Sequence, residues 1–316
     1  MGLILGVDGG NSKTELIAAT TDGELLAYIR GPGSNAHSVG AEGTFAVLDA
    51  LVQRARLEEP AEHGAFFLCG ADIPSDIAAL ERAVARRDWV RTAVVDNDTF
   101  ALLRAGTDAE DAVAVVCGTG INCVGRASGG RVARYPSLGW ETGDWGGAYM
   151  LGQEALFLAA RAVDGRGEPT VLTHLIPDQF GLPTIEAVGE AAHYHRGPTV
   201  RVSEIAPLVL AAAEDGDDVS RGLVDRLAEE IALFVRRAFA DLDVTSADVV
   251  LGGGMLTRGE GLLHDEIVRR LPRGAKPVVL RDPPVVGAAL AALDLAGAVP
   301  AAADRLRNAF QNRDGG

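Results

Sequence analysis

Residues 5–16 read LGVDGGNSKTEL, and this stretch sets the expected fold of the N-terminus. An apolar run breaks at an acid and two glycines, and a second apolar run, residues 14–20, follows the polar residues. The pair Asp22-Gly23 indicates a tight hairpin turn before a third strand-like run at residues 24–30. The N-terminus is therefore predicted to form three consecutive strands, with a Gly-rich loop between the first two.

The same order of parts returns in residues 112–126, which read AVAVVCGTGINCVGR. A strand-like run again meets a Gly-rich turn and a second run, and Gly129-Gly130 then precedes a third run at residues 131–135. Two copies of one pattern indicate an internal duplication and therefore two similar domains. A chain of 316 residues is long enough for two domains.

The remaining segments alternate between helix-like and strand-like patterns. Apolar residues at helical spacing predict helices, and short apolar runs predict buried strands. Such alternation is typical of an α/β protein. The expected helices are residues 41–56, 219–242 and 285–297, and the expected strands are residues 65–70, 92–96 and 277–280, with a strand-to-glycine transition at 247–254.

The charge balance narrows the classes of partner. There are 29 Lys and Arg residues against 44 Asp and Glu, a formal charge of −15, whereas a nucleic-acid or anionic-membrane surface would be basic. An anionic ligand such as a nucleotide would thus need backbone N–H groups, a metal ion and a few local cations. Three cysteines, without disulfide or zinc spacing, predict a reduced, cytoplasmic setting. No signal peptide or membrane span is expected.

Two Gly-rich loops are candidate phosphate sites, although the P-loop pattern does not occur. In each, consecutive backbone N–H groups can form an anion-binding concavity, and Asp8 in the first can hold Mg²⁺ through water. The alternative is a plain hairpin turn. Two such loops in a duplicated fold could grip one polyphosphate from both sides. The predicted phosphate-binding residues are Gly9, Gly10, Asn11, Ser12, Lys13, Thr14, Gly118, Thr119, Gly120 and Asn122.

Residues 94–103, VVDNDTFALL, place polar residues between a strand and a helix. In an extended run Asp96 and Asp98 would lie on one side and Asn97 on the other. Asp98 or Thr99 is expected to cap the following helix. Asp98 can also present a carboxylate to a substrate hydroxyl, which makes it the candidate catalytic residue.

Two predicted loops have the composition of a sugar site. They read GSNAHS (33–38) and SLGWETGDWGG (137–147), and they combine polar groups for hydroxyls with aromatic or glycine edges for a ring. Trp140 and Trp145 are also consistent with simple packing. The glycines of LGGGM (251–255) would let the backbone approach a flat ring, or would begin a loop or helix.

Five motifs follow one another along the chain: DGGNSKTE, VVDNDTFAL, VVCGTGINC, VVLGGGM and PPVVGAALAAL. In this order they resemble the ATP-site motifs of the superfamily of sugar kinases, Hsp70 and actin. The chain further resembles the BadF/BadG/BcrA/BcrD ATPase family, in its N-acetylglucosamine-kinase-like branch, through DGGNSKTE, the Asn of GPGSNAHSVG and the GW…GD pattern near residue 140. The implied α/β fold has two ribonuclease-H-like (actin-like ATPase) domains with an ATP cleft between them. These are residues 1–111, joined by a C-terminal helix at about 285–310, and a larger domain, residues 112–284, with the adenosine site.

The resemblance also implies residue roles. Asp8 organises Mg²⁺, Asp98 is the catalytic aspartate, and the two Gly-rich loops hold the ATP phosphates. Related kinases usually read GWG and then GDEGS, whereas this chain reads GWETGDWGG, with Trp145 where an acid is expected. Adenosine is expected against Gly252, Gly253 and Gly254, and the sugar against Asn35, His37, Asp98, Gly139, Trp140, Glu141 and Asp144.

The expected function is that of an ATP- and Mg²⁺-dependent amino-sugar kinase. It would phosphorylate the 6-hydroxyl of N-acetylglucosamine or a close relative such as glucosamine, as a cytoplasmic homodimer. One alternative is an ATPase that activates a partner enzyme, like the activators of acyl-CoA dehydratases, which hold an iron–sulfur cluster between subunits. The other is a non-catalytic ATP-binding regulator.

Overall fold

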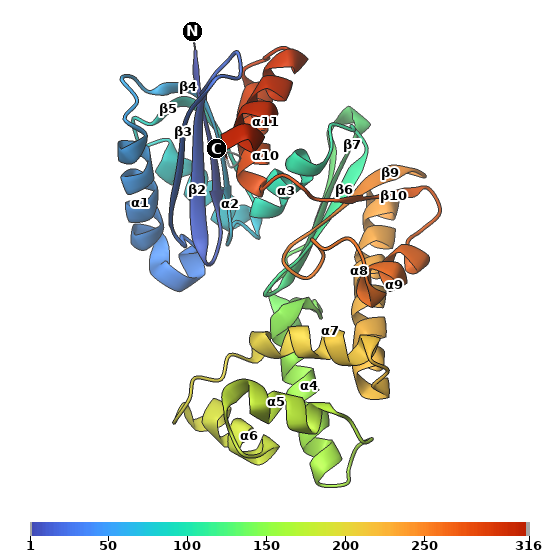
Figure 1. Ribbon diagram of the computed structural model, residues 1–316. Coiled ribbons are helices and arrows are strands. Elements are labelled where there is room, and N and C mark those ends of the chain that lie inside the picture. The colour runs from blue at the N-terminus through green and yellow to red at the C-terminus, as the bar shows by residue number, and fades with distance from the viewer. Residues whose placement is uncertain (1, 314–316) are drawn as a thin grey trace. The chain divides into compact units, whose positions relative to one another are not determined.

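The computed structural model describes residues 2–313 and contains two five-stranded sheets (Figure 1). In the first sheet the strand order is β3-β2-β1-β4-β5, with β1 antiparallel to β2 and parallel to β4. Its strands are β1 (Leu3–Gly9), β2 (Lys13–Thr20), β3 (Leu25–Pro32), β4 (Ala61–Leu68) and β5 (Val90–Asp96).

The second sheet repeats this topology. Its order is β10-β9-β6-β7-β8, so that a consecutive three-strand unit again adjoins a pair of parallel strands. The predicted duplication and the α/β fold class are therefore confirmed. Its strands are β6 (Ala112–Cys117), β7 (Ile121–Ala127), β8 (Arg131–Arg134), β9 (Ala247–Gly252) and β10 (Ala275–Val279).

The chain divides into two compact units. The first contains Met1–Ala114, Val124–Pro136 and Leu280–Gly316, and the second contains Val115–Cys123 and Ser137–Val279. The predicted domains, residues 1–111 with 285–310 and residues 112–284, stay a prediction, because compactness alone does not show that either part folds independently. Among the residues described, no helix is both long and apolar enough to cross a membrane.

Helices cover both faces of the first sheet. Because alternate residues of a strand point to opposite faces, each strand contributes side chains to the core on either side. In β1, Ile4 belongs to the core under α10, whereas Leu5 and Val7 belong to the core on the opposite face. Figure 1 shows α10 and α11, from the C-terminal end of the chain, beside the N-terminal strands. The helices of this unit are α1 (Ala36–Ala55), α2 (Pro74–Val84), α3 (Asp98–Gly106), α10 (Pro284–Leu295) and α11 (Pro300–Arg313).

One glycine permits the close contact between α10 and the sheet. A Cβ on Gly6 in β1 would lie 2.2 Å from the backbone nitrogen of Ala289 in α10, far inside van der Waals contact. The Ala-rich sequence of α10 is thus explained by tight packing on both β1 and α3.

The second unit carries the other helices. Helix α8 follows the predicted amphipathic pattern, with Leu223, Leu227 and Ile231 buried. Between α4 and α7, in residues 164–200, the chain forms two short helices, α5 and α6. The helices are α4 (Gly147–Val163), α5 (Leu172–Phe180), α6 (Ile185–Tyr194), α7 (Ala206–Glu214), α8 (Asp218–Asp241) and α9 (Leu262–Arg270).

Candidate active site

The first Gly-rich loop is a tight hairpin between β1 and β2. The amide of Gly10 donates to the carbonyl of Lys13 at 2.9 Å, and the amide of Ser34 donates to the carbonyl of Gly10 at 3.0 Å. Thr14 is fully buried and its hydroxyl donates to Ser34 Oγ at 2.8 Å. The buried side chain of Thr14 therefore supports the hairpin from the protein interior. Asn11 and Ser12, at the tip of the hairpin, are exposed.

Carboxylates gather beneath this hairpin. Asp8 and Glu15 are directly opposite each other in the β1–β2 ladder, and both are buried. Glu15 is partnered, because Lys13 Nζ donates to it at 2.5 Å and Tyr28 donates its hydroxyl. Burial, followed by repulsion from Asp98 and Glu15, raises the pKa of Asp8 to about 8. The site therefore has an excess of negative charge.

This excess suits a divalent cation bound together with a polyphosphate. Within residues 2–313 no three His, Cys, Asp or Glu side chains form a ready-made metal site. Mg²⁺ does not require one, because it keeps several waters and commonly binds through one or two carboxylates plus substrate phosphates. Asp8 fits such a role, since a bound cation would compensate its buried charge.

The replacement Asp8→Asn is expected to stabilise the protein in the absence of metal. Because the folded-state pKa lies above the unfolded value of 3.8, the wild type loses stability as the pH rises from about 4 to about 8. Because asparagine does not titrate, position 8 adds no such pH dependence to the stability of the variant. In urea unfolding with EDTA, the variant should gain about 1–2 kcal/mol over the wild type at pH 9, and the gain should shrink towards pH 4.5. An equal difference at both pH values would contradict the buried, uncompensated charge of Asp8.

Asp98 is the first residue of α3, directly after β5. Asn97 is the N-cap, because its side chain accepts from the amide of Thr99 at 2.9 Å. The expectation that Asp98 or Thr99 caps the helix is therefore wrong. Since the helix begins at Asp98, the alternation of an extended strand does not apply, and Asp96 is separately paired with Arg134.

The electrostatic environment of Asp98 favours a proton acceptor that works near neutral pH. Its carboxyl is half-buried, and burial, followed by repulsion from Asp72, raises its pKa to about 7. A general base is most effective when its pKa lies near the working pH. Asp98 thus combines position, partial exposure and a suitable pKa.

Asp72 links the helices that carry the candidate sugar residues. Its Oδ1 accepts from Asn97 Nδ2 at 2.8 Å, and its Oδ2 lies 3.7 Å from His37 Nε2. The side chain of Asn35 accepts from the amide of His37 at 2.9 Å as the N-cap of α1 and donates to Asn11 Oδ1 at 2.5 Å. Asn35, His37, Asp72 and Asn97 therefore form one connected polar network with the tip of the hairpin, and Asp98 directly follows Asn97.

Asp72 and Asn97 are absent from the residues predicted from sequence. The carboxyl ends of the parallel strands β1, β4 and β5 would have identified them, because ligands bind at such edges in α/β sheets. Asp8 is in β1 near its end, Asp72 follows β4, and Asn97 follows β5. The predicted loop at 33–38 is also corrected, since α1 begins at Ala36 and contains His37.

The second Gly-rich loop joins β6 and β7 and is fixed by the start of α4. The amides of Ala148 and Tyr149 donate to the carbonyls of Gly118 and Thr119 at 2.8 and 2.9 Å. A Cβ on Gly118 or Gly120 would have no heavy atom within 4 Å. The backbone of this hairpin is thus rigid and can be approached by a ligand, as the phosphate prediction requires.

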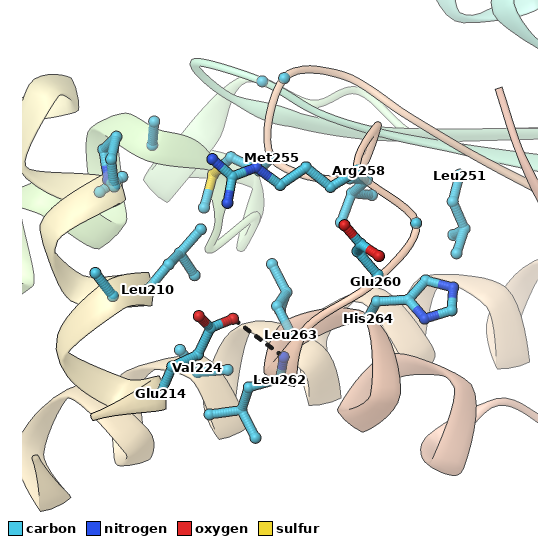
Figure 2. Close-up of a pocket in the computed structure, with 18 of the residues that line it drawn as sticks. Leu210, Glu214, Val224, Leu251, Met255, Arg258, Glu260, Leu262, Leu263 and His264 are labelled. Carbon is cyan, nitrogen blue, oxygen red and sulfur yellow. Dashed lines mark hydrogen bonds between the residues drawn. The ribbon is translucent and has the colours of Figure 1, made fainter. Parts of the chain in front are cut away.

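A cavity of about 580 Å³ extends from this hairpin, and we name it the Met255 cavity (Figure 2). Gly118 and Thr119 line it together with Gly254 and Met255, which follow β9. Figure 2 shows that α7, α8 and α9 contribute further side chains, with Glu214 accepting from the amide of Leu262. Sequence reasoning missed these lining residues: Leu210, Glu214, Arg258, Leu263 and His264.

The three glycines after β9 have different positions. Gly254 lines the Met255 cavity, whereas Gly252 ends β9 and is buried. Gly253 has φ 90°, and a Cβ there would lie 2.4 Å from the carbonyl oxygen of Cys117. Gly253 thus permits a turn that no other residue adopts without strain.

A second cavity of this unit, about 450 Å³, contains all four sugar residues predicted at 137–147, and we name it the Trp140 cavity. Trp140 is 75% exposed, whereas Trp145 is buried beneath the guanidinium of Arg226, 4.0 Å from the ring centroid. Trp145 is therefore a packing residue. The predicted residues that line the cavity are Gly139, Trp140, Glu141 and Asp144.

Known proteins share this sequence and fold. A relative from Clostridium acetobutylicum named N-acetylmuramic acid/N-acetylglucosamine kinase is 30% identical over 275 residues, 84% of this chain and 89% of the relative. The N-acetyl-D-glucosamine kinase of Dictyostelium discoideum is 25% identical and covers 92% of this chain and 98% of its own. A crystal structure from Chromobacterium violaceum, described as a candidate N-acetylglucosamine kinase, has the same fold, with a TM-score of 0.68, 24% identity, and coverage of 92% of this chain and 98% of that one.

The family model of the BadF/BadG/BcrA/BcrD ATPases matches residues 5–292, a range that includes both Gly-rich hairpins, Asp98 and the turn after β9. The expected resemblance is therefore confirmed, and the chain belongs to the BadF/BadG/BcrA/BcrD ATPase family.

Proposed function

We propose that this protein is an ATP-dependent kinase that phosphorylates the 6-hydroxyl of N-acetylglucosamine or a close relative such as glucosamine. The observation that carries the proposal is the position of Asp98, a half-buried residue at the start of α3 whose neighbour Asn97 is joined through Asp72 to His37. The two relatives named as N-acetylglucosamine kinases support the same reaction.

In this reaction Asp98 accepts the proton of the sugar hydroxyl. The hydroxyl oxygen then forms its bond to the γ-phosphorus of ATP while the bond to the β,γ-bridging oxygen breaks, and ADP leaves. Such transfers depend mostly on positioning and on stabilising charge. Asp72 would act as a positioning residue, because it holds Asn97 next to the catalytic aspartate.

Each unit offers groups that suit part of an ATP molecule. The Met255 cavity is of suitable size for a nucleoside, and Gly118 and Thr119 at its edge would hold phosphates. In the first unit, the hairpin backbone of Gly9 to Lys13 has N–H groups that suit a phosphate. Mg²⁺ would add charge stabilisation at the phosphates, with Asp8 as its protein contact.

The alternative of a partner-activating ATPase has less support. Cys117 and Cys123 are buried, whereas a cluster held between subunits needs cysteines at the surface of each subunit. The side chain of Cys117 instead contacts the sulfur of Met255 at 3.8 Å. A non-catalytic regulator would not require a base with the properties of Asp98.

A sugar panel tests the proposal directly. With Mg-ATP, N-acetylglucosamine should stimulate ADP release, and 6-deoxy-N-acetylglucosamine should not, because it lacks the accepting hydroxyl. Phosphorus NMR of the product should show a 6-phosphate ester. ADP release that is independent of every sugar would contradict the kinase and would favour an ATPase. The cytoplasmic location and the homodimer stay predictions.

A further inference from the structure

The charges that line the Trp140 cavity bear on which amino sugars the protein uses as substrates. This inference rests on the proposed kinase function. We propose that this cavity receives the substituents of a neutral amino sugar and rejects one that bears a carboxylate, with Glu141 as the specificity-determining residue.

The charged groups that line the cavity all have the same sign. Glu141 and Asp144 line it, and its described lining contains no Lys, Arg or His. A substrate carboxylate placed there would meet two carboxylates and no cation. Repulsion of this kind is a common way to reject an unwanted ligand.

Arg226, which contacts Trp145 of the same loop, is engaged elsewhere. Arg226 stacks on the buried ring of Trp145, and its NH1 donates to both carboxylate oxygens of Glu154, at 2.7 and 2.9 Å. Arg226 does not line the Trp140 cavity. Moving it to a substrate would break both contacts, so it does not neutralise the acidic lining.

The acidic loop is also held in a fixed shape. The amide of Leu138 donates to Thr142 Oγ1 at 3.0 Å, the amide of Asp144 donates to the carbonyl of Gly139 at 3.0 Å, and Thr142 also binds the carboxylate of Asp144. Gly139 and Gly143 adopt positive φ values of 86° and 80°. Because the loop is internally bonded, the backbone that carries the exposed side chain of Glu141 is held in place.

The rest of the lining suits an uncharged acyl group. Met150 and the exposed ring of Trp140 offer apolar surface, and Gln153 Nε2 donates to the hydroxyl of Tyr149 at 3.1 Å. An acetamido group has an apolar methyl and an amide, which match such a surface. The relative from Clostridium acetobutylicum is named for both N-acetylmuramic acid, which is carboxylated, and N-acetylglucosamine. If this chain rejects the carboxylated sugar as proposed, the two proteins differ in specificity.

Steady-state kinetics with three sugars test this inference. They are N-acetylglucosamine, N-acetylmuramic acid and the methyl ester of N-acetylmuramic acid, which is as large as the acid but neutral. We expect kcat/KM for the acid to be at least about tenfold below that for N-acetylglucosamine, and the ester to recover most of the difference. Added salt should narrow the gap for the acid, because it screens charge repulsion.

The variant Glu141→Gln should improve the ratio of acid to N-acetylglucosamine by about threefold or more. The control Glu190→Gln removes the same charge from an exposed position of α6 and should leave the ratio unchanged. Wild-type use of the acid as efficiently as N-acetylglucosamine would overturn the inference, and so would equal rejection of acid and ester. If no sugar stimulates ADP release, the proposed function itself fails, which is a different result.

Discussion

The variant Asp98→Asn is expected to lower kcat by about 10²- to 10⁴-fold, the usual contribution of a general base. Asparagine keeps the size of the side chain and its place at the start of α3, but it cannot accept the proton of the sugar hydroxyl. The fold should survive, because Asn97 and not Asp98 provides the N-cap of the helix. Single-turnover phosphorylation of N-acetylglucosamine measures the chemical step directly.

The matched control is Asp96→Asn, two residues earlier at the end of β5. The Asp96 carboxylate is paired with Arg134 on β8 and accepts from the amide of Asn97 at 2.7 Å; the variant loses the ion pair, keeps an oxygen that can accept from this amide, and leaves the carboxylate of Asp98 in place. Its kcat should stay within about threefold of the wild type, since such pairs contribute little. If Asp98→Asn keeps more than about a tenth of wild-type activity, the assignment of Asp98 as the base is wrong.

The variant Gly253→Ala is expected to lower the free energy of unfolding by about 2–3 kcal/mol, because it adds both backbone strain and a steric clash. The backbone has φ 90°, and the new Cβ would lie 2.4 Å from the carbonyl oxygen of Cys117. That oxygen also accepts from the amide of Met255 at 3.1 Å. Any shift therefore displaces the lining of the Met255 cavity, and KM for ATP should rise as well.

Gly254→Ala separates this structural effect from contact with the nucleotide. A Cβ at Gly254 would have no heavy atom within 4 Å, so urea unfolding should detect a change below about 0.5 kcal/mol. If adenosine lies against Gly254, KM for ATP should nevertheless rise. Equal stability losses in the two variants would show that the turn after β9 is not constrained as described.

Local sequence patterns are sufficient to predict the duplicated fold. Strand, Gly-rich turn, strand, tight turn and strand occur in both halves, and these are local patterns of alternation and turn chemistry. Each pattern spans only a few neighbouring residues, so it can be read without knowing what packs against it. The residue order also identified Asp98 as a candidate base, because a polar residue stood between a buried strand and a helix.

Which of these side chains are available to a ligand depends on how the chain folds. Ser12 and Thr14 are both hydroxyl residues of the first Gly-rich loop. Thr14 is nevertheless fully buried against Ser34, whereas Ser12 is exposed. The two tryptophans of the loop likewise differ, because Trp145 packs under Arg226 whereas Trp140 is exposed. Burial depends on the neighbours that the fold brings together, and those neighbours are distant in sequence.

The tertiary structure also revealed the surroundings of the candidate base Asp98. Asp72 follows β4 and lies 25 residues before Asn97, to which it is hydrogen-bonded. No local pattern links these positions, because parallel strands β4 and β5 are joined by a helix and meet only in the sheet. The pKa of Asp98, raised by burial and by Asp72, is therefore a property of the folded chain and not of the motif VVDNDTFAL.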